Sequence, residues 1–191
     1  EITEPTEIPD MMEGAEIVPV ACDAANGKPS LFWSATGMPI GLEIDVMGDT
    51  EAEIHGAPEE GGGGQSYTIE LAVEDQWDQV ATQEYTFYVH KPVQFISPEI
   101  IEAGMEGVDY SYVLQVENGY VSDGGSYTFS SNNLPDWLFL DQSTGELYGT
   151  PDEVSSYSFD VTVQDEWSTP TSQTMTFLLS VGVDTTHVRI L

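Results

Sequence analysis

Acidic residues in two similar turns are the part of this sequence best suited to chemistry, because calcium binds about six to eight oxygen ligands from carboxylates, carbonyls and water. The candidate calcium ligands are Asp75 and Asp78 in one turn and Asp165 and Glu166 in the other. Near the start of each half of the chain, Glu13 and either Glu102 or Glu106 are candidates to approach those turns. In the alternative interpretation, Asp75 and Asp165 accept hydrogen bonds that close a turn. The sequence leaves both interpretations open.

Two tryptophans stand beside these acids, and they suggest a different ligand. Trp77 and Trp167 each lie two residues after the aspartate of their turn. Aromatic rings on a wet face stack on sugar rings, so both are candidate ligand-binding residues of a carbohydrate-binding adhesin module. In the competing interpretation they are core or loop anchors, as are Trp33 and Trp137.

The polar residues do not form a pattern typical of an enzyme. His55, His90 and His187 are scattered, and no Gly-x-Ser-x-Gly motif occurs. A nucleophile needs an adjacent base and an orienting group, and one cysteine with three separate histidines offers no zinc pattern. Carboxylate pairs carry no information where acids are so abundant. We therefore predict a protein without catalytic activity.

The charge balance excludes two classes of partner. The chain has 34 Asp and Glu against three Lys and Arg, a formal net charge of −31, while 40% of its residues are hydrophobic. Nucleic acids and acidic membrane surfaces bind clustered cations, so we expect neither as a partner. Cys22 is the single cysteine and has no partner for an intrachain disulfide. No stretch approaches the roughly 18 apolar residues of a membrane span.

The elements that position these residues occur twice. Met38–Asp45 is similar to Leu134–Asp141, and Tyr67–Trp77 is similar to Tyr157–Trp167. Internal similarity of this kind is typical of repeated domains. We expect two domains, residues 1–91 and 92–183, followed by a tail, residues 184–191.

Each copy is predicted to be all-β. Apolar residues occupy every second position of Tyr67–Val73 and Tyr157–Val163, a period of two that indicates a strand with one buried face. The pairs Asn26-Gly27 and Asn118-Gly119 are typical of turns that need a positive φ. Several short strands per copy, with such turns between them, predict two tandem immunoglobulin/cadherin-like β-sandwich domains.

Three blocks of the second copy together resemble a known family. Leu134–Asp141, Thr144–Pro151 and Tyr157–Asp165 are similar to the dystroglycan-type cadherin-like repeat, also described as the immunoglobulin-like repeat of He-PIG type. The first copy departs from the pattern, with Gly48-Asp49-Thr50 and Gly56-Ala57-Pro58 in place of Thr-Gly and Gly-Thr-Pro. The resemblance implies an extracellular β-sandwich of a larger surface protein, and no enzyme.

The resemblance also bears on cofactors and partners. Some members of the family bind calcium at loop acids, yet the linker His90–Val93 lacks the Asp-x-Asn-Asp-Asn segment of true cadherins. Other protein domains, subunits of a surface assembly, or polysaccharide are the expected partners. Three functions stay open: a structural spacer or adhesive module, a carbohydrate-binding adhesin, and a filament subunit whose segment Ile2–Ile8 or Gly182–Leu191 lies in the sheet of a neighbouring chain.

Overall fold

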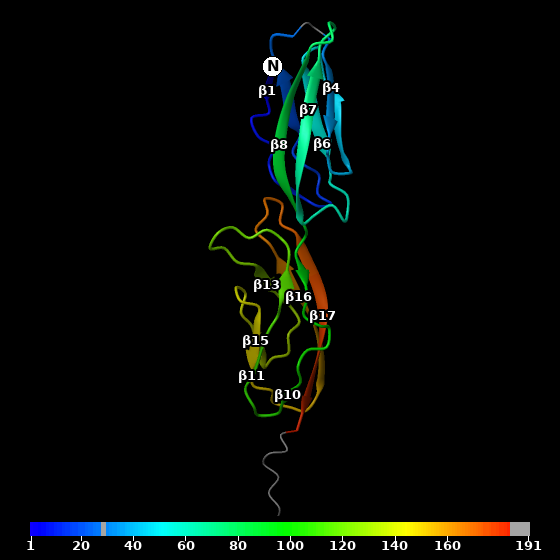
Figure 1. Cartoon of the computed structure of the whole chain (residues 1–191). Coiled ribbons are helices and arrows are strands. Elements are labelled where there is room, and N and C mark those ends of the chain that lie inside the picture. Colours follow the sequence, from blue (N-terminus) through cyan, green and yellow to red (C-terminus); the bar gives the residue numbers. More distant parts are fainter. Residues whose placement is uncertain (28–29, 184–191) are drawn as a thin grey trace, which may run out of the picture. The chain divides into compact units, whose positions relative to one another are not determined.

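The computed structural model describes residues 1–27 and 30–183 and divides the chain into two compact units (Figure 1). Unit 1 is Glu1–Lys91 and unit 2 is Pro92–Leu191. The described residues contain strands and turns and no helix, so the all-β prediction is confirmed. Accordingly, no helix in this part of the chain is long and apolar enough to cross a bilayer.

Unit 1 is a sandwich of two four-stranded sheets. Its strands are β1 Ile2–Glu4, β2 Met11–Met12, β3 Val20–Ala24, β4 Phe32–Thr36, β5 Leu42–Val46, β6 Glu51–Gly56, β7 Gln65–Glu74 and β8 Val80–His90. They form sheets of order β1-β3-β6-β5 and β2-β8-β7-β4. Cys22 and Ile54 from the first sheet share one buried cluster with Trp33 and Leu71 from the second. The core of unit 1 therefore lies between its two sheets.

Unit 2 has its own core. Its strands are β9 Gln94–Phe95, β10 Gly104–Met105, β11 Tyr110–Val113, β12 Val116–Glu117, β13 Thr128–Ser130, β14 Leu138–Leu140, β15 Glu146–Gly149, β16 Ser156–Gln164 and β17 Ser172–Gly182. The larger sheets have the orders β10-β17-β16-β13 and β11-β15-β14, and β12 pairs with β9. Leu138 and Leu147 of the second sheet pack in one cluster with Phe159 and Phe177 of the first.

A long antiparallel hairpin runs through each unit. In unit 1, β7 pairs with β8 from Gln65↔Val89 to Glu74↔Val80, and in unit 2, β16 pairs with β17. Ile69, Leu71 and Val73 are buried, whereas Thr68 and Glu70, on either side of Ile69, are exposed. The period of two in the sequence thus produces one core face and one solvent face.

Turn residues adopt the conformations that their types allow. Asn26 and Asn118 have φ angles of 64° and 60°, and Gly145 has a φ of 70°. The carboxylate oxygen Oδ1 of Asp141 accepts hydrogen bonds from the backbone N–H groups of Ser143 and Thr144, both at 2.9 Å. Because the bonds hold the loop before β15 closed, the register of β14 against β15 follows from local sequence.

The N-terminal segment packs on its own unit. Ile2 pairs with Ala24 of β3, the Tyr85 hydroxyl donates a hydrogen bond to the Pro5 carbonyl at 2.7 Å, and Ile8 is buried in the core. The prediction that Ile2–Ile8 lies in a neighbouring chain's sheet is therefore wrong for this structure. For the alternative segment, β17 pairs within its own sheet through Gly182, and residues 184–191, the predicted tail, lie outside the described residues.

Candidate functional site

The turn between β7 and β8 is built around Asp75. This side chain is only 7% exposed, and its Oδ1 accepts hydrogen bonds from the backbone N–H groups of Trp77 at 2.8 Å and Gln79 at 3.1 Å. Asp78 donates its backbone N–H to the Asp75 carbonyl and has a φ of 60°, which places it at the tip of a tight turn. The carboxylate of Asp75 thus closes the hairpin, as the turn-acceptor interpretation predicts.

The corresponding acid of unit 2 is Asp165. It is 5% exposed, and its Oδ1 accepts from the backbone N–H groups of Thr171 at 2.7 Å and Trp167 at 3.3 Å. Its Oδ2 accepts from the Thr171 hydroxyl at 2.7 Å and the Tyr120 N–H at 3.1 Å. Four donors compensate for the desolvation of this buried carboxylate, and they tie the loop after Asn118 to the β16/β17 turn.

Glu166 fixes the same loop from outside. Its Oε2 accepts from the Ser122 hydroxyl at 2.6 Å and the Ser122 N–H at 3.0 Å, and its Oε1 accepts from the Ser126 N–H at 3.2 Å. The Ser122 hydroxyl, followed by these two backbone groups, lowers the pKa of Glu166 below its ordinary value. The charged Glu166 side chain therefore holds residues 122–126 in place.

The three remaining candidate ligands lie far from the turns of their own units. Glu13 follows β2, which pairs with Val89 and His90, whereas Asp75 follows the opposite end of the same hairpin. At about 3.3 Å per residue, a ten-residue strand separates the two by roughly 30 Å. Glu102 and Glu106 flank β10, which pairs with Val181 and Gly182 at the end of β17 away from Asp165. The prediction that these glutamates approach the turns within a unit is wrong, because the parallel pairing of β2 and β10 places them at the other end.

Local bonds explain the positions of these glutamates. The Glu13 carboxylate accepts from the Gly63 N–H at 2.5 Å, the Glu102 carbonyl accepts from the Tyr110 hydroxyl, and the Glu106 N–H donates to the Gly182 carbonyl at 2.9 Å. Within residues 1–27 and 30–183, no three His, Cys, Asp or Glu side chains gather as a metal site. The support for calcium binding is therefore the sequence pattern alone.

The tryptophans have different environments. Trp33 and Trp137 are buried in the cores of their units, as the anchor interpretation predicts. Trp167 is half-buried, with its ring against that of Tyr120 at a centroid distance of 5.2 Å. Trp77 is 61% exposed and is the better placed of the two candidate ligand-binding residues.

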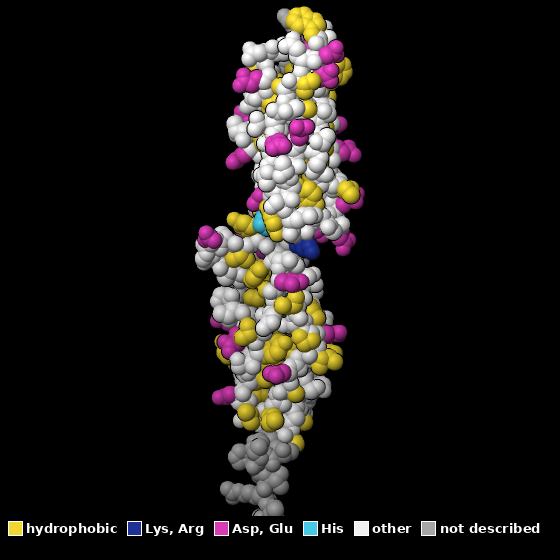
Figure 2. All heavy atoms as spheres, viewed as in Figure 1, with side chains coloured by type: hydrophobic (Ala, Val, Ile, Leu, Met, Phe, Trp, Pro, Cys, Tyr) yellow, Lys and Arg dark blue, Asp and Glu magenta, His cyan; other side chains and the backbone are white. Residues whose placement is uncertain are grey.

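Among the described residues, His55 and the surface acids have neighbours on adjacent strands, and His187 lies outside the described residues. His55 lies on β6, where its Nε2 is 3.1 Å from Oδ2 of Asp45 on the neighbouring strand. Figure 2 shows Asp and Glu side chains scattered over the visible face of both units. Several of them face each other directly across strands, as Glu70 faces Glu84. Such facing acids repel each other.

An exposed aromatic pair was missed by the sequence analysis. Phe139 of β14 lies directly opposite Tyr148 of β15, and their ring centroids are 5.7 Å apart. Both residues sit at the polar positions of alternating strands, between Leu138 and Leu140 and after Leu147. The sequence shows that each of these aromatic residues stands at an outward strand position. Only the pairing register shows that Phe139 and Tyr148 lie opposite each other.

Comparison with known proteins identifies the fold of the chain. Residues 92–182 match the family model described as Putative Ig domain. No curated protein sequence matches the chain. Among solved structures, the chain is similar to an I-band fragment of titin, with a TM-score of 0.52, 10% identity and coverage of 93% of this chain and 63% of that one. It is also similar to the IG1+IG2 structure of DIP-gamma, with a TM-score of 0.51, 12% identity and 96% coverage of both chains.

Another similar structure belongs to a much longer enzyme. The endo-fucoidan hydrolase MfFcnA4 from glycoside hydrolase family 107 matches with a TM-score of 0.42 and 18% identity over 95% of this chain, which spans 28% of the hydrolase chain. At such identities the likeness concerns the fold alone. The titin and DIP-gamma matches confirm the prediction of immunoglobulin-like β-sandwich structure.

Proposed function

Residues 92–182 match the model of the family described as Putative Ig domain, and from this match we propose that the chain is a non-catalytic, extracellular structural module that carries tension within a larger surface protein. Immunoglobulin-like folds host many functions, so the proposal depends on how the strands of this chain would respond to force. The observation that carries it is the parallel pairing of the first long segment of unit 2 with its last strand.

Segment Glu99–Glu106 runs alongside the end of β17. The Leu178 N–H donates to the Glu99 carbonyl at 2.8 Å, and the Ile101 N–H donates to the Leu178 carbonyl at 3.2 Å. Farther along, β10 pairs in parallel with Val181 and Gly182, and the Glu106 N–H donates to the Gly182 carbonyl at 2.9 Å. These bonds join the beginning of the unit directly to its end.

This arrangement resists a pull on the two ends of unit 2. A pull on the chain acts on unit 2 before Glu99 and after Gly182. It therefore drives segment Glu99–Glu106 and the end of β17 in opposite directions along their length. Hydrogen bonds between parallel strands are evenly spaced and slanted, and they run across the direction of such a pull rather than along it, so several must break together. In unit 1, β2 pairs in parallel with Val89 and His90 at the end of β8 in the same way.

A comparison of two pulling directions tests the proposal. In the first, the chain is held by its ends in a single-molecule force experiment. In the second, handles are attached through S156C and S180C, whose positions pair directly across β16 and β17, so that the hairpin opens one bond at a time. Cys22 does not compete for labelling, because it is buried and burial raises the pKa of its thiol to about 11.

We expect unit 2 to unfold at a clearly higher force when it is pulled by its ends than when its hairpin is opened. Each end-to-end event should release roughly 30 nm of chain, as about 90 residues at up to 3.6 Å each require. Equal unfolding forces in the two directions would contradict the proposal that the chain carries tension.

The exposed ring of Trp77 favours carbohydrate binding as a second candidate function. Its 61% exposure leaves an aromatic surface for a sugar ring. A glycan array with the intact chain and its W77A variant tests this candidate. A saccharide signal that W77A abolishes would support it, and a signal that W77A leaves unchanged would contradict it.

A further inference from the structure

The outer face of the sheet β11-β15-β14 of unit 2 is aromatic. Register places Phe139 opposite Tyr148 and Tyr148 opposite Ser111, so these three side chains form one row across the sheet. In the next row, Val113 lies opposite Glu146. We call the face formed by Phe139, Tyr148, Ser111 and Val113 the aromatic face.

The aromatic face is open to solvent. Phe139 is 54% exposed, Tyr148 is 45% exposed and Val113 is 50% exposed. The two rings lie 5.7 Å apart with their planes tilted by 32°, and they present a continuous apolar surface on adjacent strands. Alternation would place polar residues there, and grouped exposed apolar side chains mark interaction sites.

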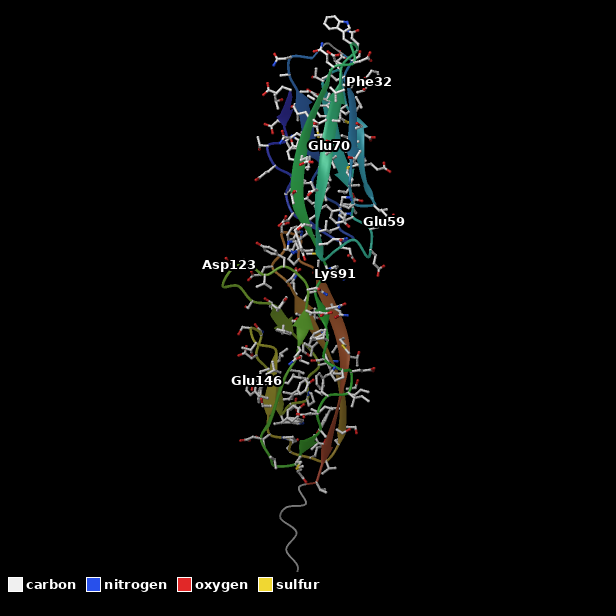
Figure 3. All side chains as sticks on the ribbon, viewed as in Figure 1. Phe32, Glu59, Glu70, Lys91, Asp123 and Glu146 are labelled. Atoms are coloured by element: carbon white, nitrogen blue, oxygen red, sulfur yellow. The ribbon has the colours of Figure 1, made fainter. Side chains whose placement is uncertain are left out.

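Carboxylates border the aromatic face on both sides. Glu146, which Figure 3 labels, lies two residues before Tyr148 on β15. Its Oε1 accepts from the Ser111 hydroxyl at 2.6 Å. On the other side, Asp109 Oδ1 accepts from the Thr150 hydroxyl at 2.7 Å. Among the described residues, Glu146 Oε2 and Asp109 Oδ2 accept no hydrogen bond, so each carboxylate keeps one oxygen for a partner.

The fold itself does not require aromatic residues at these positions. In unit 1, β5 and β6 pair with the same geometry, and Glu43 lies opposite His55. The sequence blocks that contain Glu43 and Phe139 are similar, as are those that contain His55 and Tyr148. The polar residues Glu43 and His55 therefore occupy the corresponding positions in the sheet of unit 1. This indicates that Phe139 and Tyr148 have a role other than folding.

Charge identifies the kind of partner. A second copy of this chain would bring 34 further acids against three further cations, so like charges would oppose its approach. A segment with arginine or lysine is complementary, because a cation binds the faces of aromatic rings and pairs with carboxylates. We infer that the aromatic face of unit 2 docks an arginine- or lysine-bearing segment of another protein, with the cation over Phe139 and Tyr148 and held by Glu146 and Asp109. This inference does not depend on the proposal that the chain carries tension.

The test uses a matched pair of peptides. The first is an acetylated, amidated peptide of alternating arginine and serine, and the second replaces arginine with citrulline, which has nearly the same shape but no charge. Binding to the intact chain is measured by calorimetry at about 150 mM salt, where surface charges separated by more than about 8 Å are largely screened. We expect the arginine peptide to bind and the citrulline peptide to bind at least tenfold more weakly.

The decisive variant transfers the unit 1 pair to unit 2. F139E/Y148H places the residues of positions 43 and 55 on the aromatic face and makes the chain more acidic. If the aromatic face binds the cation, affinity for the arginine peptide should fall about five- to tenfold, as the loss of cation–π contacts implies. If the general negative charge of the chain binds the peptide, affinity should stay equal or rise, which would overturn the inference.

A second variant pair guards against loss of folding. E146Q should lower the affinity for the arginine peptide several-fold, whereas E53Q, the matched change in unit 1, should leave that affinity unchanged. Equal effects of these two variants would overturn the inference. Concentration-dependent dimerisation that F139E/Y148H abolishes would assign the aromatic face to a second copy instead, and a saccharide that binds the intact chain but not the variant would assign it to carbohydrate.

Discussion

Thr171 donates twice to Asp165: its backbone N–H lies 2.7 Å from Oδ1 and its hydroxyl lies 2.7 Å from Oδ2. The threonine thus occupies both oxygens of a carboxylate that is almost fully buried. Tyr120 adds a third contact, from a loop 45 residues earlier. The β16/β17 turn and the loop after Asn118 are therefore held by one side chain.

We predict that D165N destabilises unit 2 by about 1–3 kcal/mol, because an amide nitrogen replaces an acceptor oxygen and leaves buried donors unpaired. D123N is the matched control, since it removes the same charge from an exposed residue of the nearby loop (Figure 3). Urea unfolding, with hydrogen exchange to follow β16 and β17, measures the change. An equal stability of the two variants would show that Asp165 does not hold the turn.

Removing a charge from a pair of facing acids should increase stability, in contrast to D165N. Glu70 and Glu84 are exposed and lie directly opposite each other on β7 and β8, and like charges in such a pair are destabilising. E84Q should stabilise unit 1 by a few tenths of a kcal/mol up to about 1 kcal/mol at low salt, and the gain should shrink as salt screens the pair. E59Q, outside the sheets, is the control for net charge. A gain that salt does not reduce would contradict this explanation.

The Asp141 turn predicts a loss of stability in acid. The Ser143 hydroxyl, and then the N–H groups of Thr144 and Ser143, lower the pKa of Asp141 from 3.8 to about 2. A carboxyl with a lowered folded-state pKa stabilises the fold above its unfolded pKa, and this contribution disappears as pH falls through the folded value. Thermal melts should therefore show the intact chain losing more stability than D141N between about pH 4 and pH 2. Parallel curves would contradict the prediction.

The sequence was sufficient for local structure and insufficient for positions set by pairing. Alternation at Tyr67–Val73 and turn residues such as Asn118 and Gly145 predicted what the structure contains, because these features depend on neighbours along the chain. The separation of Glu13 from Asp75 depends on a parallel pairing between distant segments, which no local pattern specifies. For the same reason the meeting of Phe139 with Tyr148 became visible only through register.

Calcium provides a direct test of the candidate ligands. Both oxygens of Asp165 are hydrogen-bonded, and Glu166 is bonded to Ser122 and Ser126, so coordination would have to break these bonds. We therefore expect the melting temperature in calcium to equal that in sodium chloride at matched ionic strength. A stabilisation that exceeds the sodium value and grows with calcium concentration, as mass action requires for a bound ion, would instead support coordination.

The tension-carrying role of unit 2 is tested most directly by a comparison of two proline variants under force. E106P removes the N–H that joins Glu106 to the Gly182 carbonyl, whereas V108P removes a turn bond from Val108 to the Met105 carbonyl. When the chain is pulled by its ends, E106P should lower the unfolding force of unit 2 clearly more than V108P, even if the two variants melt at similar temperatures. An equal unfolding force in both variants would contradict the claim that the parallel pairing with β17 carries the load.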